Sequence, residues 1–250
     1  MLDAHLHLCD DTLYSDAPHI IEEALKAYID QFLCVVTNHE ELKRAYKLKK
    51  KFPMMKIAAS TTPHDAKDLN DPFFEEVKDA AQRKLIDAIG ETGLEYFYPG
   101  LDRALQKEYL NRYLDLALET DLPLVFHCRD AFNDLFEALR PYKGKLRGMV
   151  HCFTGTYEEA KTAIDLGFLI SISGIVTFKN SHSLQVACTK LPLSSLLIET
   201  DSPYLAPLSQ RGKTNRPVFI KETYQKVAQL KNVSPQELER HVTDNFNRIF

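Results

Sequence analysis

The chain has 250 residues, of which 44% are hydrophobic and 26% charged, and this balance is ordinary for a globular protein. Its formal net charge of −4 gives no broad attraction to polyanions, so nucleic acid would have to be bound through metal ions or a local basic site. The five cysteines form no Cys-x-x-Cys pair, which argues against a disulfide framework, a zinc ribbon or a thioredoxin-like motif. No leader pattern precedes the first predicted strand and no apolar run approaches membrane-spanning length, so we expect a cytoplasmic protein without a membrane partner.

Short apolar runs alternate with longer amphipathic stretches throughout the chain. Strands are predicted at residues 2–8, 31–37, 56–60, 87–91, 123–127, 148–151, 168–173 and 196–201. Helices are predicted at residues 40–51, 102–120, 131–139, 157–166, 182–191, 217–231 and 235–248. The last of these has the start of a capping box, with Ser234 as the N-cap, Pro235 at the first helical position and Glu237 at the third.

This alternation predicts an α/β protein with one domain over residues 1–250, a (β/α)8 TIM barrel with an additional C-terminal helix. A doubly wound open sheet is the alternative, but no glycine-rich phosphate loop follows the first strand. The chain shows no linker, internal repeat or low-complexity tract that would divide it. The sequence does not define the oligomeric state, and we favour a monomer.

The first strand carries Asp3, His5 and His7 at alternate positions. Side chains alternate between the faces of a strand, so these three point one way while the leucines between and beside them point towards apolar packing. Two imidazoles on one strand face can bind a single divalent metal. Alone, the pair fits an ordinary amphipathic strand equally well.

Further potential ligands lie at the ends of other predicted strands. The six candidates are His5, His7, Glu91, His127, His151 and Asp201. A single histidine or glutamate at a strand end is more often a hydrogen-bonded rim residue, but in a barrel all these ends meet on one face. Six nitrogen and oxygen ligands gathered there predict two divalent metals, zinc, magnesium or manganese, bridged by a carboxylate.

Ordered motifs along the chain match one known family. They are DAHLH at 3–7, GETGLEY at 90–96, LPLVFHCRDA at 122–131, HCFTG at 151–155, SGIVTFKN at 173–180, ETDSPYLAP at 199–207, RGK at 211–213 and NFNRIF at 245–250. Over essentially its whole length the chain resembles the TatD family of metal-dependent deoxyribonucleases, within the amidohydrolase-like barrels. The family commonly has a histidine at the position of Thr62, an aspartate at that of Glu95 and a glutamine at that of Arg112, and these departures bear on substrate choice and rate.

The resemblance implies that His5, His7, Glu91 and Asp201 hold one metal. The second metal would be held by Glu91, His127 and His151, with Glu91 as the bridge. The implied activity is hydrolysis of phosphodiester bonds in DNA, typically single-stranded and from the 3′ end, with RNA as a further substrate. The partner is therefore nucleic acid.

Two alternatives stay open. A barrel of this kind could use two metals on another bond, such as an amide or the aminoacyl ester of a tRNA. Related amidohydrolases often bridge their metals with a carboxylated lysine on the fourth strand, and the predicted fourth strand ends in Glu91 with no lysine near its end. The other alternative is a barrel that binds nucleic acid or a protein without catalysing a reaction. The presence of all six candidate ligands disfavours this alternative.

The catalytic candidates are Asp201 and Glu91. Asp201 would meet a single metal and could orient a water and take its proton, unless it is only a ligand and bulk water takes the proton. Glu199 lies two residues earlier on the same strand face, and we expect it to orient a ligand. Cys128 and Cys152 each follow a proposed ligand, so strand alternation predicts that both are buried core thiols.

Substrate contacts are predicted mainly from charge and position. The candidates are Arg129, Arg211, Lys213, His64 and Tyr96, with Phe178 and Tyr204 as further aromatic residues that could stack on bases. Each of these residues could instead have an ordinary structural role. The arginines could form salt bridges, and the aromatic residues could pack against their neighbours. The basic run at 43–51 is more typical of a solvated helix face than of a nucleic-acid track.

Overall fold

The structure is a computed structural model and describes residues 1–67 and 71–250. Within these residues a sheet of eight strands runs in chain order from β1 to β8, and each pair of neighbours is parallel. The strands are β1 (Leu2–Leu6), β2 (Gln31–Val36), β3 (Met55–Ala59), β4 (Ala88–Glu95), β5 (Leu124–Arg129), β6 (Gly148–Val150), β7 (Phe168–Ile172) and β8 (Leu196–Ile198).

Hydrogen bonds just beyond β8 close this sheet into a barrel. The backbone N–H of Asp201 donates to the carbonyl of His5 at 2.9 Å, and the N–H of His7 donates to the carbonyl of Ser202 at 2.7 Å. The Asp3 carboxylate also accepts the N–H of Thr200 at 2.9 Å. The predicted (β/α)8 barrel is therefore confirmed, and the open doubly wound sheet is wrong.

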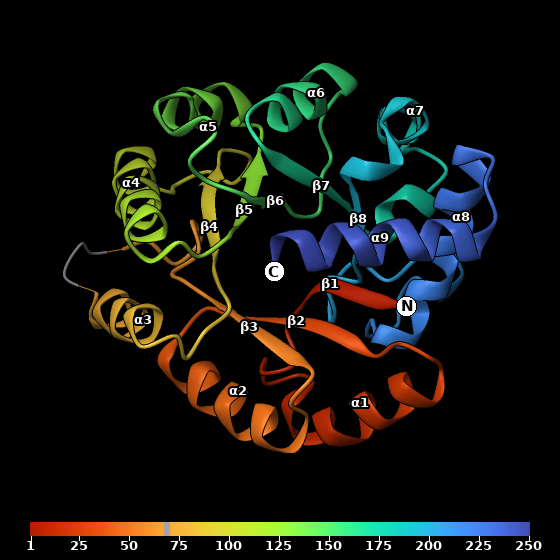
Figure 1. Cartoon of the computed structure of the whole chain (residues 1–250), viewed down its shortest axis with the longest axis horizontal. Helices are drawn as coiled ribbons and strands as arrows, with labels where there is room; N and C mark the ends of the chain where they lie inside the picture. The colour runs from red at the N-terminus through yellow and green to blue at the C-terminus, as the bar shows by residue number, and fades with distance from the viewer. Residues whose placement is uncertain (68–70) are drawn as a thin grey trace.

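Helices surround the barrel as an outer layer (Figure 1). They are α1 (Ala17–Lys26), α2 (His39–Lys51), α3 (Pro72–Gln82), α4 (Arg103–Thr120), α5 (Phe132–Leu139), α6 (Tyr157–Asp165), α7 (His182–Lys190), α8 (Ile220–Lys231) and α9 (Pro235–Ile249). Helices α1 and α3 lie outside the predicted helical segments, and the helix predicted from residue 217 starts as a short 3-10 turn, Pro217–Phe219. The Ser234 side chain accepts the N–H of Glu237, as its N-cap position predicts.

The strands are buried on both faces because side chains fill the barrel and helices cover its outside. In β2, β7 and β8 this shows as nearly unbroken apolar runs, such as Phe168–Ile172. Continuous apolar strands are typical of parallel sheets covered by helices. The core extends from the barrel interior into the layer between strands and helices.

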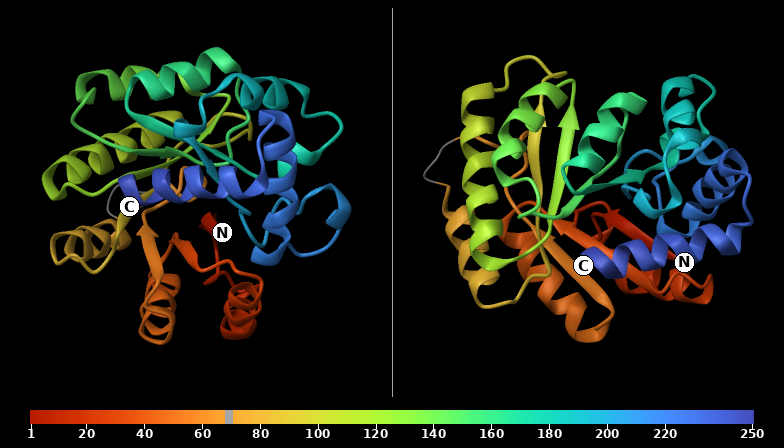
Figure 2. Two further views of the ribbon diagram at one scale, coloured as in Figure 1. Left: turned by 45° about the vertical axis from the view of Figure 1, so that its right-hand side comes forward. Right: turned by 45° about the horizontal axis from the view of Figure 1, so that its top comes forward.

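Helix α9 covers the end of the barrel where the strands begin. Asn245 on α9 donates to the carbonyls of Leu193 and Leu196, at the start of β8. Both termini lie beside this helix in Figures 1 and 2. The amino group of Met1 contacts Glu239, and the carbonyl of Phe250 accepts a hydrogen bond from Lys56. The helix therefore closes this end and leaves the carboxyl ends of the strands open at the other.

Candidate metal centre

Strand β4 brings Glu91 into the barrel. The sequence predicted that this strand ends at Glu91, which is wrong, because β4 continues to Glu95. Its register with β5 shifts between Gly90 and Thr92, so the run of alternating side chains changes there. A Cβ at Gly93 would stand 1.9 Å from the carbonyl oxygen of His127, so only glycine allows β4 and β5 this close approach.

One group of donor atoms lies around the ends of β1 and β8. The Nε2 atoms of His5 and His7 are 3.2 Å apart. His5 Nε2 is 3.5 Å from Glu91 Oε2 and 3.6 Å from Asp201 Oδ1. His7 Nε2 is 3.6 Å from the same Glu91 oxygen and 3.5 Å from the same Asp201 oxygen. Donor atoms from β1, β4 and the segments that follow β1 and β8 thus lie close to the two imidazoles.

A second group uses the other oxygen of Glu91. Glu91 Oε1 is 2.8 Å from His127 Nδ1 and 2.8 Å from His151 Nε2. The two histidine nitrogens are 3.3 Å apart. Glu91 therefore directs one carboxylate oxygen at each group, and all six residues predicted as ligands come together at one end of the barrel.

The donor chemistry and spacing of both groups fit divalent metal ions. Zinc binds histidine nitrogen and carboxylate oxygen at about 2.0–2.2 Å, and four such donors in a tetrahedron stand roughly 3.4 Å apart. In the first group, the separations of the His5 and His7 nitrogens from each other and from the two carboxylate oxygens, 3.2 to 3.6 Å, are close to that spacing. The second group offers three donors and so leaves room for a water or substrate oxygen.

Opposite charges dominate the electrostatics of these groups. Burial alone would raise the pKa of Glu91, but the charge and hydrogen bonds of His151 and His127 hold it well below its usual range. Burial would lower the pKa of His7, whereas its bond to Asp201 and the charge of Glu91 raise it to about 9. Glu91 is therefore ionised, and without metal His7 holds a proton that a cation would displace. The pKa of His5 is instead lowered, by burial and by the charge of His151.

Further buried carboxyl groups lie behind the candidate ligands. Glu199 Oε1 accepts the N–H of Cys152 at 2.7 Å and lies 3.4 Å from His151 Nδ1. His5, whose ring stacks on that of His151 at 3.9 Å, also belongs to this buried group. Glu199 is thus placed as expected for a residue that orients a ligand. Burial raises the pKa of Asp3 to about 8, although hydrogen bonds from Thr200 act to lower it.

Glu95 supports His127 from the opposite side. Its Oε2 is 3.1 Å from His127 Nε2 and 3.8 Å from His64 Nε2. Gln106 on α4 fixes the backbone of Glu95, accepting its N–H at 2.8 Å and donating to its carbonyl at 3.2 Å. Sequence reasoning missed Gln106. It also named Glu95 only as a departure from the family pattern, because the predicted strand ended at Glu91 and left Glu95 outside it.

The donor groups lie in a cavity of about 860 Å³. Seven of its lining residues are acidic: Asp10, Glu41, Asp65, Glu91, Glu95, Asp130 and Asp201. Arg129 is the one lysine or arginine among the lining residues of the described chain. Thr62 also lines the cavity and donates to Asp65 at 2.9 Å.

The predicted substrate contacts divide into two sets. Arg129 and His64 line the cavity, as does the aromatic candidate Tyr204. Arg211 and Lys213 are exposed and lie outside the cavity lining, with Arg211 stacked 4.5 Å from the ring centroid of Phe178. The role of Arg211 and Lys213 as substrate contacts stays a prediction, and it concerns a substrate long enough to extend beyond the cavity.

The ring of Tyr96 also lies outside the cavity lining. Its hydroxyl donates to Asp134 at 2.6 Å, and Arg103 covers its ring at 4.1 Å. The next two residues, Phe97 and Tyr98, line the cavity instead, and sequence reasoning missed both. The only signal was their place beside the GETGLEY motif, because an aromatic residue in a loop does not reveal which way it points.

The two cysteines beside the ligands differ from each other. Cys128 is buried, as predicted, although it contributes to the cavity lining. The prediction that Cys152 is a buried core thiol is wrong, because it is partly exposed and its Sγ lies 3.3 Å from Ser173 Oγ. It follows the end of β6 with a φ of 41°, so strand alternation no longer applies there.

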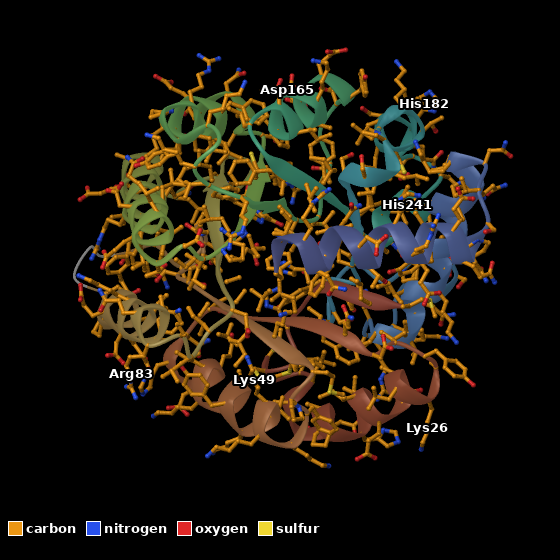
Figure 3. The ribbon with its side chains drawn as sticks, in the orientation of Figure 1. Lys26, Lys49, Arg83, Asp165, His182 and His241 are labelled. Carbon is orange, nitrogen blue, oxygen red and sulfur yellow. The ribbon has the colours of Figure 1, made fainter. Side chains whose placement is uncertain are left out.

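The remaining histidines and the basic run lie in the outer layer. Figure 3 shows His182 on α7 and His241 on α9, and neither residue lines the cavity. Arg112 packs over Phe74 at 3.7 Å and does not line the cavity. Four cations of the 43–51 run form ion pairs with acidic side chains: Lys43, Arg44, Lys49 and Lys51. These pairs favour the solvated-face interpretation of the run.

A parallel barrel with histidines and carboxylates at its open end defines a class, the metal-dependent hydrolases. A family profile described as TatD related DNase matches residues 2–250. The chain is 35% identical to an uncharacterized metal-dependent hydrolase, YcfH of Escherichia coli K12, over all of this chain and 95% of that one. It is 31% identical to the 3′-5′ ssDNA/RNA exonuclease TatD of Pantoea ananatis, over all of this chain and 99% of that one.

The structure agrees with these comparisons. The crystal structure of YJJV, a TatD homolog from Escherichia coli K12, has a TM-score of 0.94 and 25% identity, covering all of this chain and 97% of that one. The chain belongs to the TatD family of metal-dependent hydrolases. Among residues 1–67 and 71–250, no helix combines the length and apolar character needed to cross a membrane.

Proposed function

We propose that the protein hydrolyses phosphodiester bonds of single-stranded DNA from the 3′ end, with two divalent metal ions, and that RNA is a further substrate. The observation that carries the proposal is the carboxylate of Glu91, whose two oxygens face two separate donor groups. The family description and the exonuclease activity in the name of the Pantoea ananatis relative support the choice of bond and polarity.

The ligands proposed for the first metal are His5, His7, Glu91 and Asp201. His127 and His151 join Glu91 at the second. When bound, such a metal pair polarises a phosphoryl oxygen, lowers the pKa of a water and stabilises charge during in-line displacement. The ions are zinc, manganese or magnesium, because imidazole and carboxylate together suit these cations.

Asp201 is the proposed acceptor of the proton from the attacking water. Burial would raise its pKa, but the hydrogen bond from His7 and the charge of His5 lower it, so the carboxylate is ionised and can accept a proton. Asp201 contacts His5 and His7 through Oδ1, which leaves its other oxygen for a water. Glu91 fixes the relative position of the two donor groups.

Charge in the cavity makes binding of a polyanion depend on metal. Among the residues that the structure describes, seven acidic ones line it against the one guanidinium of Arg129. Without cations, a phosphate would be repelled from this cavity. Arg129 is the proposed phosphate contact, since a guanidinium can grip a phosphate through two parallel hydrogen bonds.

The test compares single strands labelled at either end. We expect metal-loaded protein to shorten 5′-labelled DNA progressively and to release mononucleotide at once from 3′-labelled DNA. His127→Ala should lose at least about a hundredfold in rate, because removal of a ligand disrupts the metal centre. His182→Ala on α7 is the matched control. Full activity of His127→Ala would refute the proposal, and hydrolysis of an aminoacyl-tRNA or an amide but not of DNA would establish the alternative bond.

A further inference from the structure

We propose that Phe97 and Tyr98 form a stacking platform for the nucleobase next to the scissile phosphodiester. This inference rests on the proposed function, which supplies the nucleic acid as ligand. The two residues follow β4 directly and line the cavity. Their side chains are 53% and 48% exposed, whereas most large apolar side chains of a folded protein are buried.

A continuous series of rings connects the platform to the candidate metal centre. The ring centroids of His127 and His64 are 5.0 Å apart, and those of His64 and Tyr98 are 5.7 Å apart. Tyr98 and Phe97 follow at 5.1 Å with their planes at 86°. In a nucleic acid a single sugar separates each base from its phosphate. A base-binding surface must therefore begin close to the metals, and this one begins two ring contacts from His127.

Arg129 joins this wall of the cavity. Its guanidinium carbon lies 3.8 Å from the ring centroid of Phe97 and 5.4 Å from that of Tyr98. These cation–π contacts hold the guanidinium beside the aromatic residues. The wall thus offers a positive charge for a phosphate and adjacent rings for a base, which is the combination found in proteins that bind single strands without strong sequence preference.

The other aromatic candidates near the site are already engaged. Tyr96 is hydrogen-bonded to Asp134 and covered by Arg103. Tyr204, on the opposite wall, donates to Asp10 at 3.2 Å. The Tyr98 side chain makes no hydrogen bond among those described, and Phe97 is contacted by Arg129 on the cavity wall itself. Tyr204 is as exposed as these two residues, at 51%, but the platform offers two adjacent rings beside a guanidinium.

The test measures base stacking separately from hydrolysis. The probe is a short single-stranded oligodeoxynucleotide with phosphorothioate linkages and 2-aminopurine beside its terminal linkage, made with the fluorophore at the 3′ end and at the 5′ end. It is titrated into metal-loaded protein. Stacking on an aromatic ring quenches this fluorophore, so wild type should quench one of the two probes. The double substitution Phe97→Ala with Tyr98→Ala should abolish quenching and weaken binding roughly 5- to 100-fold.

Two further variants sharpen the comparison. Phe97→Tyr keeps an aromatic ring and should retain both quenching and affinity. Tyr28→Ala removes a tyrosine that is 81% exposed between α1 and β2, at the other end of the barrel, and should have no effect. Unchanged affinity and quenching in the double variant would overturn the platform, as would absence of quenching in wild type. If wild type binds and quenches but hydrolyses no DNA, the platform stands and the proposed function fails.

Discussion

At the scale of single residues, the site depends on how each ligand is charged before metal arrives. The two donor groups hold their carboxylates and imidazoles within hydrogen-bonding or ion-pairing distance of one another. Burial removes water as a competitor, so these charges act on each other strongly. The same contacts that stabilise the proton on His7 also fix the donor atoms where a cation can replace that proton.

The pKa of His7 predicts proton release when metal binds. Its bond to Asp201 and the charge of Glu91 outweigh burial and raise this pKa to about 9, so His7 is protonated at pH 7.5 in the metal-free protein. A metal needs the neutral imidazole, and we therefore expect at least one proton to be released per chain and metal affinity to rise with pH up to about 9. Calorimetric titrations in two buffers of different ionisation enthalpy measure this release. Identical heats in both buffers would contradict it.

Glu199 offers a second prediction at this scale. Glu199→Gln keeps the shape of the side chain but removes the charge beside His151 Nδ1. Loss of a carboxylate that orients a histidine ligand typically weakens metal binding by about 10- to 100-fold. Competition with a chromogenic chelator measures the affinity. Asp165→Asn, on the outer helix α6, is the control and should bind metal as wild type does. Equal affinities in all three proteins would show that Glu199 has no role in orienting the ligand.

At the scale of elements, the contact between β4 and β5 sets the position of both donor groups. Glu91 belongs to β4 and His127 to β5; the register of the two strands shifts between Gly90 and Thr92, and His127 pairs with Gly93. Gly93 allows the two strands to approach, since any Cβ there would collide with the His127 carbonyl. The geometry of the site therefore depends on glycines that contact no substrate.

Gly93→Ala should destabilise the protein by about 3 kcal/mol or more, because the added Cβ forces apart two paired strands. Gly212→Ala is the matched control. Gly212 also has a positive φ, 85°, but no atom lies within 4 Å of an added Cβ, so the cost should be limited to about 1–2 kcal/mol of backbone strain. Urea unfolding of both variants measures the difference. Equal free energies of unfolding for the two variants would mean that a Cβ at position 93 does not force β4 and β5 apart.

The sequence predicted the barrel because apolar runs and helical patterns alternate along the whole chain. It also predicted which ligands would meet, because strand ends in a barrel share one face. It could not predict that β4 runs past Glu91 to Glu95, since a register shift leaves no periodic signal. Nor could it show that Phe97 and Tyr98 rather than Tyr96 line the cavity, because loop side chains follow no fixed alternation.

At the scale of the whole molecule, the two ends of the barrel differ: one is closed, and the other carries the donor groups. Helix α9 and both termini close one end through contacts such as Asn245 with the start of β8. The other end carries the buried carboxylates and histidines of the donor groups. A cation that binds these groups in the folded protein but not in the unfolded chain stabilises the folded state. Metal binding should therefore contribute to the stability of the entire fold.

Removal of metal should lower the melting temperature. A ligand at about a thousand times its dissociation constant stabilises the folded state by ~4 kcal/mol. For a chain of this size that corresponds to a shift of roughly 8–16 °C. Thermal unfolding followed by circular dichroism, with and without exhaustive chelation, measures it. An unchanged melting temperature in protein shown to have lost its metal would contradict the prediction.

The most direct test of the two-metal centre is the number of divalent ions per chain in wild type and in Glu91→Gln, measured by plasma mass spectrometry after reconstitution and desalting. We predict two ions per chain for wild type and at most one for Glu91→Gln, together with loss of hydrolysis. A single ion in both proteins, or undiminished hydrolysis after every ion has been removed, would contradict the proposal that Glu91 bridges a pair of metals.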